Sequence, residues 1–142
     1  CFAEIKPKTR DSILRRLNFI YDQDEINIPF ITQASSEQTI CFCIKKEHCL
    51  LIKNEIEKTF KFELSNKIIE RIIIEKNISI ITVIGQNMIK QYGMAGEIFT
   101  ILGNNSINIK AISQGSSEIS ISFIIDKLDE IKTLNILHSH LI

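Results

Sequence analysis

The sequence predicts an α+β protein in which one small module occurs twice, and two observations support this prediction. First, residues 26–37 (INIPFITQASSE) return as residues 107–118 (INIKAISQGSSE), at an offset of 81 positions, with polar residues repeated as faithfully as apolar ones. Second, strand-like and helix-like patterns follow one another in the same order in both halves. The length suits two domains of roughly 70 to 80 residues, which we place at 1–76 and 77–142.

The second copy gives the clearer pattern. A β-branched strand is expected at 78–84, and a polar loop at 86–92 leads into a helix at 93–102 that the Gly-Asn-Asn sequence at 103–105 should end. Strands at 107–113 and 118–125 form a hairpin. A second helix is expected at 128–138, with its apolar side supplied by Leu128, Ile131, Leu134, Ile136 and Leu137.

The first copy repeats this order and adds a strand. We expect an opening strand at 1–5, a helix at 12–23, hairpin strands at 26–33 and 37–44, a helix at 47–60 and an Ile-rich strand near 67–74. The resulting β-α-β-β-α-β order is that of the ferredoxin-like fold. Pro29 removes a ladder donor, so its strand should lie at a sheet edge. The second copy lacks a closing strand, and we interpret the chain as a piece of a longer protein.

Composition excludes several classes of function. Seventeen basic residues balance seventeen acidic ones, whereas nucleic-acid binders usually present a basic face. The longest apolar run, near 68–84, is interrupted by four charged residues and cannot span a membrane. The four cysteines are not spaced like metal ligands, so we expect buried thiols in a reducing cytoplasm and no metal site. Cys41 and Cys43, two apart in a strand, should point to one face.

The repeated residues resemble a known family. The segments 32–37 (TQASSE) and 113–118 (SQGSSE), together with 83–88 (VIGQNM) before 93–95 (GMA), are similar to the paired ACT domains in the regulatory region of aspartate kinases. Within that family they look most like the threonine-sensitive bifunctional aspartokinase–homoserine dehydrogenases. The kinase and dehydrogenase catalytic motifs are absent, so this piece should contain no catalytic residues. ATP and Mg would belong to the kinase domain of the parent chain.

The resemblance implies that the chain binds a small amino acid, threonine or alternatively lysine, and reports it to the kinase domain within a homo-oligomer. A free carboxylate suits the unpaired N–H groups of a helix N-terminus, and the helix after the 86–92 loop offers one. The glutamines that match the family's effector contacts are Gln33 and Gln114, which could meet an ammonium or a hydroxyl. The remaining candidate effector residues are Ile31, Asn87, Met88, Gly93, Met94, Ala95 and Ile112.

Two alternatives remain open. A dimerisation module without a working effector site would have the same fold, and so would an RNA-binding module, which needs exposed aromatic residues on its central strands.

The two pockets should also differ. With the 81-residue offset, Glu4 takes the place of Gly85 and Ser12 the place of Gly93, so we expect the second pocket to bind the carboxylate more tightly.

Overall fold

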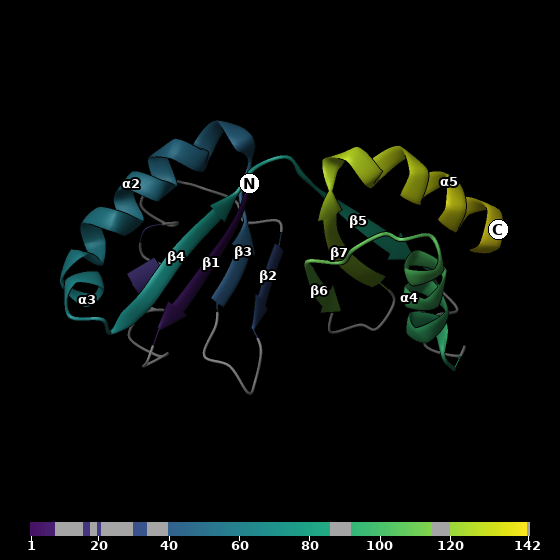
Figure 1. The fold of residues 1–142 in the computed structure, drawn as a ribbon, viewed down its shortest axis with the longest axis horizontal. Helices are drawn as coiled ribbons and strands as arrows, with labels where there is room; N and C mark the ends of the chain where they lie inside the picture. The colour runs from purple at the N-terminus through teal and green to yellow at the C-terminus, as the bar shows by residue number, and fades with distance from the viewer. Residues whose placement is uncertain are drawn as a thin grey trace. The chain divides into compact units, whose positions relative to one another are not determined.

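The chain folds as two compact units, Cys1–Lys76 and Asn77–Ile142 (Figure 1). The computed structural model describes residues 1–7, 16–17, 20, 30–33, 40–85, 92–114 and 120–141. Each unit is an antiparallel sheet covered by helices, which confirms the expected α+β, ferredoxin-like class.

The first unit contains a four-stranded sheet in the order β2-β3-β1-β4, in which every neighbouring pair is antiparallel. The strand β2 lies at the edge, as predicted for the strand expected at 26–33, although Pro29, on which that prediction was based, is outside the described residues. The strands are β1 (Phe2–Pro7), β2 (Phe30–Gln33), β3 (Ile40–Cys43) and β4 (Ile69–Glu75).

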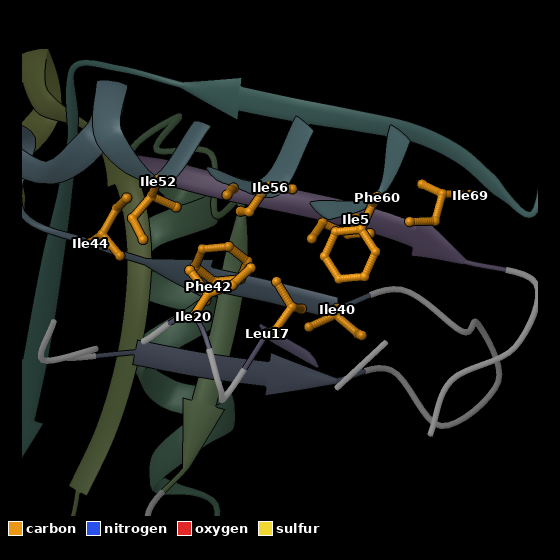
Figure 2. Packing of buried hydrophobic residues seen from close by; sticks show 11 residues of the cluster. Ile5, Leu17, Ile20, Ile40, Phe42, Ile44, Ile52, Ile56, Phe60 and Ile69 are labelled. Carbon is orange, nitrogen blue, oxygen red and sulfur yellow. The ribbon is translucent and has the colours of Figure 1, made fainter. Parts of the chain in front are cut away.

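The helices of the first unit close one face of this sheet. A short 3₁₀ turn (Lys46–His48) leads into α2 (Cys49–Thr59), and α3 (Lys61–Ser65) follows. Apolar residues at helical spacing on α2 pack against alternate residues of β1 and β3, so both periodicities meet in one core (Figure 2). The fully buried members include Ile5, Ile40, Phe42, Ile52, Ile56, Phe60 and Ile69.

The helix expected at 12–23 is described only at residues 16, 17 and 20, which are helical. Leu17 and Ile20 are buried in the core cluster. Arg16 forms a salt bridge with Glu63 of α3, donates a hydrogen bond to the Thr59 carbonyl and lies 4.6 Å from the centre of the Phe60 ring. These contacts fasten this part of the chain to the end of α2 and to α3.

The second unit contains a three-stranded sheet in the order β5-β7-β6, again antiparallel. The strand β6 is shorter than expected, because residues 107–110 are not in strand conformation. Ile107 is instead buried in the core cluster that also contains Leu102 of α4. Its N–H donates a hydrogen bond to the Leu102 carbonyl. The elements are β5 (Ile78–Ile84), α4 (Met94–Asn104), β6 (Ala111–Gln114), β7 (Ser120–Asp126) and α5 (Glu130–Leu141).

The predicted apolar side of the last helix is partly wrong. Leu128, Ile131 and Leu134 are exposed, with 95%, 74% and 50% of their surface accessible. Leu137 is buried and Ile136 packs against the core cluster, as predicted, and the buried side of α5 also carries Thr133 and Leu141. Thr133, Leu137 and Leu141 lie 81 positions after Ile52, Ile56 and Phe60, so the repeat specifies which side of the helix is buried.

The cysteine prediction is also partly wrong. The structure joins Cys1 and Cys49 by a disulfide, with their Cα atoms 6.1 Å apart. Cys41 and Cys43 are free thiols, and their pairing with Glu4 and Phe2 places both on the sheet face away from the core cluster, as expected. No described helix is long and apolar enough to cross a membrane.

Candidate functional site

The candidate site lies at one end of the second unit's sheet. Ile84, the last residue of β5, is in register with Ser120 at the start of β7, and Gln114, the last residue of β6, is in register with Ile121. Because β7 runs antiparallel to both neighbours, the ends of β5 and β6 share this end of the sheet. The connection from β5 to α4 leaves from the same end.

Among the described residues, no side chain caps the N-terminus of α4. Gly93 occupies the cap position with φ at 82°, in the left-handed region that favours glycine. The Glu97 N–H donates to the Gly93 carbonyl at 2.9 Å. Met94, Ala95 and Gly96 precede this bond, so their N–H groups have no carbonyl partner within the helix. An anion here would also gain from the helix dipole.

Apolar side chains surround this end of the unit. Ile84 is 73% exposed, and Tyr92, directly before Gly93, is fully exposed. Ile112 is in register with the buried Phe123 but keeps 43% of its surface accessible. Sequence reasoning missed Ile84 and Tyr92, although Ile84 just before the 86–92 loop and Tyr92 at its end could have been suggested by their positions. The arrangement offers hydrogen-bond donors for a carboxylate and exposed apolar groups beside them.

The predicted site residues divide into three groups. Ile112 and Gln114 belong to β6, whose end is at this end of the sheet, and Gly93, Met94 and Ala95 form the N-terminus of α4, which follows the end of β5 along the chain. Ile31 and Gln33 occupy the equivalent register in the first unit, opposite Phe42 and Ile40. Both of these pairings lie 81 positions before those of Ile112 and Gln114, so the repeated glutamines are equivalent in the backbone. Asn87 and Met88 lie outside the described residues.

One part of the predicted asymmetry is wrong, because Glu4 does not take the place of Gly85. Glu4 pairs with Cys41, and Thr82 pairs with Ser122, which lies 81 residues after Cys41. Glu4 is therefore the counterpart of Thr82 in mid-strand, 3.9 Å from Arg71 and away from the strand end. Ser12, the proposed counterpart of Gly93, lies outside the described residues.

The same comparison identifies a difference in length. The first strands match at an offset of 78, whereas the buried helix residues Leu17 and Ile98 match at 81. The chain advances 17 − 5 positions from Ile5 to Leu17, and 98 − 83 positions from the equivalent Val83 to Ile98. The connection from the first strand to the helix is therefore three residues longer in the second unit. The two units therefore differ in the length of the connection that precedes this helix.

The central-strand aromatics do not form a nucleic-acid surface. Phe42 and Phe123 are buried in the two core clusters, and Phe2, on the other face of β1, is only 5% exposed. None of the three can stack on a base. Among the described residues, no group of three His, Cys, Asp or Glu side chains is placed to hold a metal ion.

Comparison with known proteins decides the family. A family model described as "ACT domain" matches residues 81–141. The bifunctional aspartokinase/homoserine dehydrogenase of Buchnera aphidicola is 37% identical over 130 residues, which cover 92% of this chain and 16% of that protein. The chain belongs to the ACT domains of aspartate kinase regulatory regions. It spans only about a sixth of this curated relative's length.

Solved structures of aspartate kinases share the fold. The regulatory subunit of aspartate kinase from Thermus flavus superimposes with a TM-score of 0.76 at 18% identity, over 97% of this chain and 89% of that one. Aspartokinase III of E. coli, crystallised in complex with lysine and aspartate in its T-state, gives a TM-score of 0.70 at 18% identity, over 99% of this chain and 30% of that one. Both ACT units therefore have counterparts in such a region.

Proposed function

We propose that this ACT pair senses a free amino acid, threonine in the first instance, and transmits its presence to an aspartate kinase domain. The parent reaction would be ATP-dependent phosphorylation of the aspartate side chain, with ATP and Mg held by the kinase domain. The observation that supports the proposal is the strand register of the second unit: the end of β5, from which the chain leads to the N-terminus of α4, and the Gln114 end of β6 lie at the same end of the sheet.

Each part of an amino acid finds a suitable group there. The N–H groups of Met94, Ala95 and Gly96 would receive the carboxylate. Gln114 would accept from the ammonium or bond the threonine hydroxyl. Inhibition then requires the effector to bind one state of the assembly more tightly than the other.

Several lines of support favour threonine over lysine. The Buchnera relative combines a kinase with a homoserine dehydrogenase, whereas the lysine complex belongs to an aspartokinase that is only 18% identical. No acidic residue occupies the glutamine position to attract a second ammonium. Gln33, in the equivalent register of the first unit, would make a weaker second site because its helix connection is shorter.

Isothermal titration with a matched set of amino acids tests the proposal. Threonine should bind with modest affinity, because a ligand this small contributes few contacts. Valine is the control, since it has the shape of threonine without the hydroxyl, and it should bind at least about tenfold more weakly. A tenfold preference for lysine would overturn the threonine assignment, and absence of heat with every amino acid would favour a dimerisation module without an effector site.

Self-association has its own structural support. The outer edge of β5 has no described strand beside it, and its sequence ISIITVI carries no charge and no proline. The equivalent edge of β1 is covered by β4, and the outer strand β4 carries Glu70, Arg71 and Glu75. Uncharged edges of this length are normally paired or covered. A homo-oligomer is therefore proposed together with the sensing role.

A further inference from the structure

All four cysteines of the chain lie in the first unit, and the sheet separates them into two pairs. Cys1 packs against the core cluster on the helix side and is bonded to Cys49, the first residue of α2. Cys41 and Cys43 occupy alternate positions of β3 on the other face. The two pairs therefore lie on opposite faces of the sheet.

The two pairs also differ in their reactivity. Burial, with the Glu4 carboxylate nearby, raises the pKa of the Cys41 thiol to about 11. Burial raises the pKa of Cys43 to about 12, although the nearby amino terminus opposes this. Thiolates are the reactive form, so both thiols are poor partners in exchange reactions. Cys1 is only partly buried as a residue, whereas Cys49 is 5% exposed.

The disulfide closes a long stretch of chain around the core. It spans 48 residues, which include β2 and β3, and it joins the start of β1 to the start of α2. The same corner is held by a hydrogen bond from the Ile44 N–H to the Cys1 carbonyl, at 3.0 Å. A cross-link over a segment of this length restricts the unfolded chain strongly.

We propose that the Cys1–Cys49 pair is a redox-sensitive staple that sets the stability of the first ACT unit and leaves the second unchanged. Oxidation would proceed by exchange with a low-molecular-weight disulfide. One cysteine thiolate attacks that disulfide and releases one thiolate, and the second cysteine then attacks the mixed disulfide and releases the other. Two cysteine thiols and one small disulfide give one protein disulfide and two small thiols. This inference does not depend on the proposed effector.

The test compares the protein equilibrated with glutathione disulfide and with dithiothreitol. Alkylation after denaturation should label two cysteines in the oxidised protein and four in the reduced one, and peptide mapping should link residue 1 to residue 49. Oxidation should raise the unfolding midpoint of the first unit by on the order of 10 °C. Hydrogen exchange should slow in α2 and stay unchanged in α4, which serves as the internal control.

Two variants separate the staple from general effects of thiols. Cys49→Ser should lose the response to oxidation, whereas Cys41→Ser should keep it. Four labelled cysteines under oxidising conditions would overturn the proposal, and so would an equal response of Cys49→Ser and the unchanged protein. If Cys49→Ser does not fold, Cys1→Ser provides the same comparison, and the thiol count of the unchanged protein decides the matter alone.

Discussion

Replacing Gly93 and Gly96 by alanine, one at a time, should change the stability of the second unit in opposite directions. Gly93 is the cap residue of α4 and Gly96 lies in its first turn, and an added Cβ would meet no atom of the described residues within 4 Å at either position. Only Gly93 has a left-handed φ, of 82°. Gly93→Ala should therefore cost about 1 to 2 kcal/mol of stability from backbone strain, whereas Gly96→Ala should stabilise by about 0.5 to 1 kcal/mol.

Differential scanning calorimetry can resolve this difference, because a domain of this size shifts its midpoint by roughly 4 to 8 °C per kcal/mol. Hydrogen exchange of α4 would assign the transition to the second unit. Gly93→Ala should also weaken threonine binding by at most about 5-fold, since a disturbed helix N-terminus loses part of its ~0.3 to 1 kcal/mol interaction with an anion. If both variants shift the midpoint in the same direction, the conformation assigned to Gly93 is wrong.

Three further predictions concern packing, acid stability and assembly. Leu137→Ala should destabilise the second unit by about 2 to 5 kcal/mol because Leu137 is buried, whereas Leu134→Ala, on the exposed side of α5, should cost less than about 1 kcal/mol; equal losses in urea unfolding would contradict the corrected helix face. Burial alone would raise the pKa of the Glu63 carboxyl. The hydrogen bond and the positive charge of Arg16 outweigh this effect, so the pKa lies below its ordinary value of 4.5. The pair should then stabilise the first unit above about pH 4.5 and lose this effect as the pH falls, and Glu63→Gln should flatten that part of the stability profile. Light scattering should reveal self-association of the chain, and a strict monomer at all concentrations, with and without threonine, would count against the β5 edge as an interface.

The repeat made most of the fold predictable from the sequence. Strand β5 has the expected bounds, and α4 extends two residues beyond its expected end. The face of α5 was misjudged because Leu128, Ile131 and Leu134 follow a helical spacing of their own, and this local pattern outweighed the polar Thr133. Applying the 81-residue offset to Ile52 and Ile56 would have identified the buried face.

The rest depends on details that a local pattern does not contain. Glu4 was matched to Gly85 because one offset was assumed throughout, whereas strand pairing gives an offset of 78 for the first strands. The Cys1–Cys49 contact joins residues 48 positions apart and follows only from the packing of α2 on the sheet. For the candidate site, the sequence supplied the glutamines and glycines, and the structure added the strand register that places Gln33 and Gln114 at equivalent positions of the two sheets.

The most direct test of the central claim is a titration of threonine into Gln114→Ala and Gln33→Ala, measured by calorimetry beside the unchanged protein. If the second unit contains the tighter site, Gln114→Ala should weaken binding by about 1 to 3 kcal/mol, the cost of leaving a buried polar partner unpaired, and Gln33→Ala should have a smaller effect. Retained folding, checked by circular dichroism, makes the comparison valid. Loss of binding in Gln33→Ala with an unchanged titration in Gln114→Ala would contradict the account and assign sensing to the first unit.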